Sequence, residues 1–276
     1  MAILVTGATG AVGREVVRQL VARGEDVVAI SRDPESAGLP GRVVRGDLTR
    51  PEEVPLDGVT ALFLLAPLSS GNGVELAKTL VERACEAERV VFLSSDAVTR
   101  RRLGSYEGHR AVEEVVEASG KAWTHLRPGE FMGNKLVWAP TIRAHGVVRS
   151  AFPDSVGVPV HEADIAEVAV LALTGDHGGR VYTLSGPERL SLREQAAAIG
   201  TGLGRPIGFE AVTYREARAS LIADAGLPYE IAEYLLGYQV QYEQEPPEVE
   251  PAFEEVTGRR GRTLAQWAAD HAAELG

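Results

Sequence analysis

The sequence is poor in cysteine, in positive charge and in long apolar runs. Its 276 residues include one cysteine, Cys85, so neither an intrachain disulfide nor a cysteine-rich metal site can form. Asp and Glu number 39 against 28 Lys and Arg, which disfavours nucleic acid as a partner. The longest apolar run, Val59 to Leu68, is shorter than the ~20 residues of a membrane span, and the N-terminus lacks a basic, apolar leader. We therefore expect a cytoplasmic protein without a nucleic-acid or membrane partner.

Short apolar runs alternate with amphipathic stretches through the first half of the chain. The runs AILV, DVVAI, VTALFLL and RVVFLSS are continuously apolar, as strands covered by helices on both faces are. This alternation predicts an α/β fold with a doubly wound parallel sheet over residues 1–130. Residues 131–276 contain more proline and glycine connections. We expect them to form a smaller substrate-side region that packs on the core and is not an independent domain.

A glycine-rich loop follows the first expected strand and opens the first expected helix. Three glycines at fixed spacing permit a tight turn, a close approach of backbone amides to a pyrophosphate, and close packing of helix on strand. The helix N-terminus adds a positive partial charge. The loop therefore predicts a dinucleotide-binding site formed by Thr6, Gly7, Thr9, Gly10, Ala11, Val12 and Gly13.

Residues after the next strands indicate which dinucleotide binds. An acidic residue at the end of the second strand binds the ribose of NAD, whereas an arginine favours the 2′-phosphate of NADP. Ser31 and Arg32 favour NADP here, and Asp33 leaves NAD as the alternative. Asp47 is placed either to contact adenine or to cap a short turn. The remaining crevice residues expected from strand ends are Leu48, Leu65, Ala66 and Pro67.

Motifs further along the chain resemble those of one family. Four segments carry the resemblance: His109 through Glu113 to Ser119-Gly120, Thr124-His-Leu-Arg127-Pro128-Gly-Glu-Phe131 with Asn134, Asp164-Ile-Ala, and Tyr182 to Pro187. They resemble the NmrA-like NAD(P)-binding proteins, which are atypical short-chain dehydrogenases/reductases. The resemblance spans essentially the whole chain. It implies a Rossmann fold, binding of NADP(H) or NAD(H), and either reductase activity or a redox-sensing role without turnover.

The catalytic pair of the wider superfamily, Tyr-x-x-x-Lys, is altered here. If Arg110 takes the lysine place, Tyr106 is the proton donor; if His109 takes it, Ser105 stands where the tyrosine would be. We favour the second register, in which His109 contacts the nicotinamide ribose or donates a proton, although a structural pairing of His109 with Glu113 fits the spacing equally well. Ser95 is the third catalytic candidate, because it ends the fifth strand.

The sixth strand and the residues after it supply the remaining candidates. Ser94, Arg127 and Pro128 are expected to border the cofactor, and Phe131, Met132, Asn134 and Trp138 to border a substrate. His161, Glu162 and Asp164 lie close together, but we interpret them as a helix start capped by Asp164 and expect no metal. Arg100 to Arg102 is expected to be a solvated loop.

The combined expectation is an NADPH-dependent oxidoreductase that reduces a carbonyl, quinone or enone of a small organic substrate. The alternatives are an NADP(H)-binding redox sensor and a redox-neutral cyclase or isomerase. The amphipathic segment Arg262 to Leu275 packs either on its own domain or on a second copy in a homo-oligomer.

Overall fold

The computed structural model describes residues 2–102 and 105–276, which form two compact units. The first unit comprises Met1–Gly129, Glu162–Leu184 and Ala252–Arg259, and the second comprises Glu130–His161, Ser185–Pro251 and Arg260–Gly276. The chain first passes from the first unit to the second after Gly129, close to the expected boundary at residue 130. The expectation of one boundary along the chain does not match these units. Two later segments return to the first unit, one because it supplies the last strand of the sheet and a helix that covers it.

The first unit contains one seven-stranded sheet in which every pairing is parallel, with strand order β3-β2-β1-β4-β5-β6-β9. Strand order reverses between β1 and β4, so loops after these strands diverge and leave a crevice at the carboxyl edge. The predicted fold class is therefore confirmed. The strands are β1 (Ala2–Val5), β2 (Asp26–Ser31), β3 (Arg42–Arg45), β4 (Val59–Leu64), β5 (Arg89–Leu93), β6 (Ala122–Pro128) and β9 (Arg180–Leu184).

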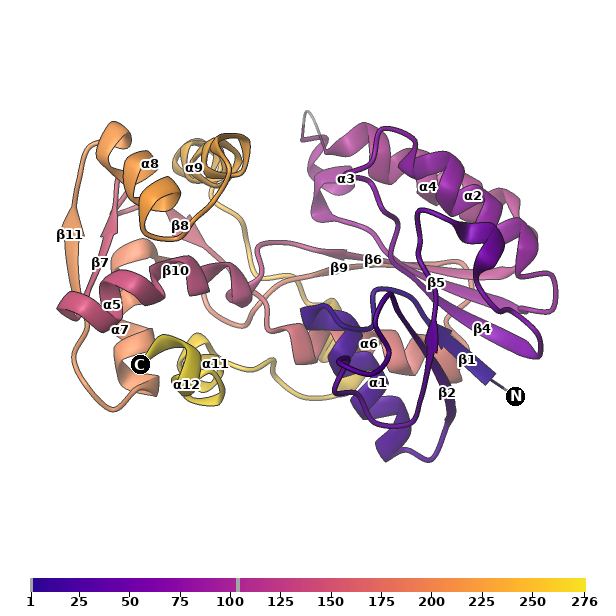
Figure 1. Ribbon diagram of the computed structural model, residues 1–276. Coiled ribbons are helices and arrows are strands. Elements are labelled where there is room, and N and C mark those ends of the chain that lie inside the picture. Colours follow the sequence, from indigo (N-terminus) through magenta and orange to yellow (C-terminus); the bar gives the residue numbers. More distant parts are fainter. Residues whose placement is uncertain (1, 103–104) are drawn as a thin grey trace. The chain divides into compact units, whose positions relative to one another are not determined.

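Helices cover both faces of this sheet, with α1 and α6 packed together on one face and α2 and α4 on the other (Figure 1). The first helix buries Val12, Val16, Val17 and Leu20, a stripe at helical spacing that faces the sheet. The helices of this unit are α1 (Ala11–Ala22), η1 (Pro51–Glu53), α2 (Gly73–Arg83), α3 (Asp96–Arg100), α4 (Tyr106–Ala118), α6 (Glu162–Thr174) and α10 (Ala252–Thr257).

Helix α6 begins two residues before the expected cap. Asp164 lies inside its first turn and is 1% exposed. Its carboxylate accepts a hydrogen bond from Arg259 at 3.3 Å, and Arg259 follows α10 in the returning segment. The prediction that Asp164 caps the helix is wrong, because a cation distant in sequence binds its carboxylate.

The second unit is built from helices around two small sheets, β8 with β10 antiparallel and β7 with β11 parallel. Its core includes Trp138, Ile142, Ile199, Leu264 and Trp267. The elements are η2 (Met132–Trp138), α5 (Ala139–His145), β7 (Val147–Ser150), β8 (Val156–Gly157), β10 (Leu190–Ser191), α7 (Leu192–Gly202), β11 (Gly208–Ala211), α8 (Tyr214–Ala223), α9 (Tyr229–Gln244), α11 (Leu264–Asp270) and α12 (Ala272–Leu275).

The C-terminal amphipathic segment packs within its own unit. Leu264, Trp267 and Ala268 are fully buried, and α11 packs on α7. The apolar stripe of this segment is therefore buried within its own unit. Across the described residues, no helix combines the length and apolar character needed to cross a membrane.

Candidate functional site

A groove of about 380 Å³ lies in the first unit, beyond the carboxyl ends of β1, β2, β3 and β4. It opens where strand order reverses, which is where open parallel sheets bind their ligands. Seven predicted cofactor residues line it: Gly7, Thr9, Ser31, Arg32, Asp47, Leu48 and Pro67. The sequence analysis missed five further lining residues: Ile30, Gly46, Thr49, Ser69 and Ser70.

The glycine loop requires glycine at two positions for different reasons. Gly7 has φ +60°, and a Cβ there would lie 2.3 Å from Leu65 Cδ2. A Cβ on Gly13 would lie 2.2 Å from the carbonyl oxygen of Gly7, so only glycine lets α1 start this close to the end of β1. Gly10, in contrast, would meet nothing closer than 3.3 Å.

Helix α1 presents a suitable N-terminus to an anion. Gly10 is its N-cap, and no described side chain caps the helix. Thr9, Gly10 and Ala11 are exposed, whereas Val12 is buried in the core. The N-terminus of α1 therefore has free backbone amides beside a glycine cradle that has no room for a Cβ. This arrangement fits the pyrophosphate of a dinucleotide.

Thr6 has a structural role that the sequence does not reveal. It is fully buried, and its hydroxyl donates to the carbonyl of Phe63 at 3.0 Å and accepts from the amide of Leu65 at 2.6 Å. Both partners belong to β4 or its end. Thr6 therefore ties the glycine loop to the neighbouring strand, and its hydroxyl is not directed to a ligand.

At the end of β2, Arg32 is exposed and lines the groove, while Asp33 is held aside. The Asp33 carboxylate accepts from the hydroxyl of Ser36 at 2.7 Å, and this hydrogen bond lowers the pKa of Asp33. Arg45 donates to the carbonyl of Arg32 at 2.9 Å, which places a second guanidinium nearby. Two guanidinium groups therefore stand at this end of the groove, beside the carboxylates of Asp33 and Asp47, and Arg32 is the one that lines the groove and could bind a 2′-phosphate.

Asp47 lines the groove and also closes the turn after β3. Its Oδ1 accepts from the amide and hydroxyl of Thr49, both within 2.9 Å, and these bonds lower the pKa of Asp47. The structure thus shows the turn-capping role, and a contact to adenine stays a prediction. Gly46 was missed although a Cβ there would lie 2.5 Å from Ile30 Cγ2; the glycine directly after a strand was the available signal.

The far wall of the groove follows β4. Leu65 packs on Gly7, Ala66 is 9% exposed, and Pro67 lines the groove. The Pro67 carbonyl accepts from the Ser70 hydroxyl at 2.5 Å. Ser69 and Ser70 carry no periodic pattern, and only the position of their loop brings them here.

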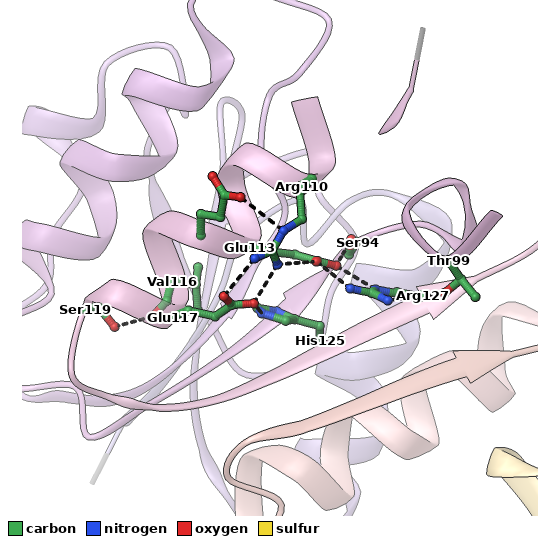
Figure 2. Close-up of polar contacts among 10 residues, drawn as sticks. Ser94, Thr99, Arg110, Glu113, Val116, Glu117, Ser119, His125 and Arg127 are labelled. Atoms are coloured by element: carbon green, nitrogen blue, oxygen red, sulfur yellow. Dashed lines mark hydrogen bonds and ion pairs between the residues drawn. The ribbon is translucent and has the colours of Figure 1, made fainter. Parts of the chain in front are cut away.

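Ser94 and Arg127 end β5 and β6, and both bind the same buried carboxylate (Figure 2). Glu113 of α4 is 0% exposed. It accepts from Ser94 Oγ at 2.7 Å, from Arg127 Nε at 2.9 Å and Nη2 at 2.7 Å, and from Arg110 at 3.1 Å. The side chains of Ser94 and Arg127 are therefore committed to Glu113. Pro128 is the last residue of β6 and pairs with Leu184 of β9.

Ser95 and the arginine run form a separate cluster at α3. Ser95 is the N-cap of α3, and its hydroxyl accepts from the amide of Ala97 at 3.2 Å. Arg102 is 7% exposed and lies 3.2 Å from the buried carboxylate of Asp96, which also binds Arg100 at 3.0 Å. The expected solvated loop is wrong for Arg102, because its side chain is buried against Asp96; Arg100, the last residue of α3, and Arg101 are exposed.

The network around Glu113 continues to His125 on β6, as Figure 2 shows. Arg110 binds Glu117 at 2.7 and 3.1 Å, and Glu117 lies 3.3 Å from His125 Nε2. Glu113, Glu117 and His125 stand close enough to hold a metal ion. Arginine guanidinium groups bind both carboxylates, so the cluster is a charge-compensated network of side chains.

The ionisation of this network should make folding stability depend on pH. Burial lowers the pKa of His125 below its ordinary 6.5, despite Glu113 and Glu117, and hydrogen bonds from Arg110 lower that of Glu117 below 4.5. For Glu113, burial raises the pKa, but Arg127 and Ser94 outweigh it and the net shift is downward. The unfolded chain therefore binds more protons than the folded chain in acid, and stability falls as pH falls.

We expect chemical denaturation to show that the free energy of unfolding declines below pH ~6.5, where His125 is titrated. The decline should be steeper below pH ~4.5, where the carboxylates are titrated. Each group contributes at most about 1.4 kcal/mol per pH unit. His125→Phe should flatten the first decline, whereas the same change at exposed His145 should not. A stability that is level from pH 7 to pH 5 in the unaltered protein would contradict the assignment.

Tyr106 and His109 both lie near the start of α4. His109 Nδ1 is 2.8 Å from the carbonyl oxygen of Ser105. A carbonyl only accepts, so Nδ1 carries the hydrogen and Nε2 of the neutral ring is bare. Nε2 can then donate a proton only from the imidazolium. The pairing of His109 with Glu113 is wrong, because Ser94, Arg110 and Arg127 take that carboxylate. Tyr106 is half-buried.

The residues expected to border a substrate lie in the second unit. Asn134 and Trp138 line a pocket there, whereas Met132 is 1% exposed and belongs to the core. Phe131 is half-buried, and its backbone bridges to Val160. Two of the four predicted residues therefore share a pocket. The sequence analysis missed Glu130 and Lys135, which line it too.

Comparison with known proteins agrees with this geometry. A reductase of (4-alkanoyl-5-oxo-2,5-dihydrofuran-3-yl)methyl phosphate from Streptomyces griseus subsp. griseus is 38% identical, with 98% of each chain covered. An NAD(P)H azoreductase from Xenophilus azovorans is 34% identical, with 99% of each chain covered. Both relatives extend over the two units.

Solved structures and a family model extend the comparison. The NADPH-dependent quinone oxidoreductase of Escherichia coli has a similar fold, with TM-score 0.82, 24% identity and coverage of 98% and 99% of the two chains. The regulator NmrA shares the fold at TM-score 0.75 and 17% identity, with 98% and 94% covered. The NAD(P)H-binding family model matches residues 7–176. This chain therefore belongs to the NAD(P)H-binding family.

Proposed function

We propose that this protein is an NADPH-dependent reductase of a carbonyl, quinone or enone group in a small organic substrate. The observation that carries the proposal is the groove of the first unit, which brings together a glycine cradle, a bare helix N-terminus and Arg32. Relatives that cover the whole chain, a dihydrofuranyl phosphate reductase and an azoreductase, support reduction as the reaction type.

Different residues of the groove bind different parts of the cofactor. The amides at the start of α1 bind the pyrophosphate, Arg32 binds the 2′-phosphate, and Asp47 with Leu48 borders the adenine. When bound, NADPH supplies the hydride. Arg32 makes NADPH the preferred form, because Arg32 lines the groove, whereas Asp33 does not line it and its carboxylate accepts from Ser36.

His109 is the proton donor in this proposal. As imidazolium it donates from Nε2 to the substrate oxygen that becomes a hydroxyl, and the Ser105 carbonyl holds the ring through Nδ1. Solvent then returns the proton to Nε2. Tyr106 is the competing donor, because its phenol is close in sequence and half-buried.

The test is NADPH consumption with a panel of quinones, enones and ketones. We expect turnover with at least one class, and Arg32→Ala should raise KM for NADPH about 10- to 100-fold while leaving KM for NADH nearly unchanged. His109→Gln should lower kcat about 100-fold with little change in KM for NADPH.

Matched variants separate these effects from damage to the fold. Arg23→Ala removes an exposed arginine at the far end of α1 and should leave both cofactor constants unchanged. Tyr106→Phe should keep most of the activity. If Tyr106→Phe loses activity and His109→Gln retains it, the proton donor is Tyr106, and absence of turnover across the panel in protein that binds NADPH argues against a reductase.

A further inference from the structure

The second unit contains a pocket lined by seven apolar and seven polar residues. Its volume is about 60 Å³, room for roughly four to six atoms the size of water. Residues of η2, β7, α7, α8 and α9 line it. The apolar part of the wall consists of Val137, Trp138, Leu192, Ala217, Leu221, Leu235 and Leu236.

Two of the polar lining residues form a buried ion pair. Lys135 Nζ lies 2.5 Å from Glu130 Oε1, and the two side chains are 3% and 6% exposed. Lys135 Nζ also lies 4.8 Å from the centre of the Trp138 ring. An ammonium group has three hydrogens to donate, and among the described residues Glu130 is the one hydrogen-bond acceptor it meets. A buried lysine with spare donors in the wall of a pocket is costly unless a ligand accepts from it.

The charges around the pocket are already balanced. Glu130 neutralises Lys135, and Arg149, the other cation of the wall, binds Glu210 at 3.0 and 3.2 Å. The second oxygen of Glu130 is buried and has no hydrogen-bond partner in the described part of the chain. The carboxylate of an anionic ligand would lose its hydration in the pocket, would lie beside this unpaired oxygen, and would find no cation without a partner carboxylate. The pocket therefore favours an uncharged ligand.

The two helices that close the pocket are also apolar on their outer face. Four of the six large hydrophobic side chains exposed among the described residues lie on α8 and α9. They are Ile222, Tyr229, Ile231 and Tyr234. Leu221, Leu235 and Leu236 point into the pocket from the same helices. Apolar residues on both faces are typical of elements that admit an apolar ligand.

We propose that this pocket binds a short aliphatic arm of an uncharged carbonyl compound, with Lys135 donating a hydrogen bond to an oxygen of that arm. The apolar wall excludes water from the arm, and Glu130 keeps Lys135 charged and fixed. The inference rests on the proposed reductase function in its choice of a carbonyl compound as ligand. Binding itself can be measured without turnover.

The experiment is a ligand-observed NMR titration of the protein without NADPH, using butanone, hexan-2-one, decan-2-one and hexanoate as probes. We expect affinity to rise from butanone to hexan-2-one and then to level off, because the carbonyl group and butyl chain of hexan-2-one together fill a pocket that holds about four to six atoms. Hexanoate should bind at least about tenfold more weakly than hexan-2-one.

Two variants locate the binding. Ala217→Phe fills the pocket from α8 and should weaken hexan-2-one binding at least about tenfold, while Ala219→Phe, on the exposed face of the same helix, should not. The pair Lys135→Met with Glu130→Gln removes both charges together and should weaken it about tenfold by removing the donor. NADPH affinity, measured in parallel, reports that the first unit of each variant is folded, and urea denaturation reports that the second unit is.

Equal binding of hexan-2-one by Ala217→Phe and the unaltered protein would overturn the inference. So would hexanoate binding as tightly as the ketone, or no ketone binding by protein that binds NADPH. Ketone binding without NADPH consumption across the substrate panel would overturn the reductase function and support the pocket, so the two proposals fail separately.

Discussion

Replacing Glu113 by glutamine is expected to lower the free energy of unfolding by about 3–5 kcal/mol, the cost of leaving a buried charge without its partner. The carboxylate is 0% exposed and accepts two hydrogen bonds from Arg127, whose side chain is 16% exposed. Glutamine keeps the shape and can still accept from Ser94, but it leaves Arg127 uncompensated. Because folded domains are stable by about 5–15 kcal/mol, this loss is large.

The measurement is urea denaturation at neutral pH. Glu114→Gln is the matched control, because Glu114 is 62% exposed and binds the same Arg110 at 3.2 Å; its effect should stay within about 1 kcal/mol. A loss below about 1 kcal/mol for Glu113→Gln would show that solvent compensates Arg127 and that the network does not hold β5, β6 and α4 together.

The same variant should impair reduction more than it impairs cofactor binding. Glu113 fixes residues at the ends of β5 and β6 and lies one turn after His109 on α4, whereas the glycine cradle and Arg32 lie at β1 and β2. We expect kcat to fall while KM for NADPH changes little. An equal loss in both constants would instead indicate a general loss of structure.

Gly13→Ala is expected to weaken NADPH binding about 10- to 100-fold, the range that follows from about 1–3 kcal/mol of overpacking. A Cβ on Gly13 would lie 2.2 Å from the carbonyl oxygen and 2.8 Å from the carbonyl carbon of Gly7. Both atoms are backbone, so no side chain can rotate away. The loop or the start of α1 must move, and the amides that receive the pyrophosphate move with it.

Fluorescence titration with NADPH measures the effect. Gly237→Ala, on α9 in the second unit, is the control, since its Cβ would meet nothing within 4 Å; it should leave NADPH affinity unchanged and raise stability by up to ~1 kcal/mol. Unchanged NADPH affinity in Gly13→Ala would mean that the cofactor does not use this cradle.

Much of the fold and of the cofactor groove could be predicted from local sequence. Continuous apolar runs such as Val59–Leu64 identify buried strands, and the stripe at Val12, Val16 and Leu20 identifies a helix packed on them. Part of the geometry of the glycine loop is local too, because Gly7 has a positive φ and a Cβ on Gly13 would meet the backbone of Gly7 six residues earlier. Such features need no knowledge of distant contacts.

The partners of buried charges could not be predicted in this way. Arg127 and Glu113 are 14 residues apart on a strand and a helix, and Ser94 lies on a neighbouring strand. Sequence spacing alone suggested that His109 pairs with Glu113, and charge alone suggested that Arg102 is solvated. The register of β5 against β6 and the packing of α4 decided otherwise.

The sequence by itself thus determined the alternation of strands and helices, the glycine cradle and the presence of Arg32 at the groove. The tertiary structure alone decided which carboxylate each arginine neutralises, that Glu162–Leu184 and Ala252–Arg259 return to the first unit, and that Lys135 and Glu130 pair in the wall of a pocket. Periodicity and turn sterics act within a few residues, whereas the desolvation of a charge depends on whatever the whole fold brings beside it.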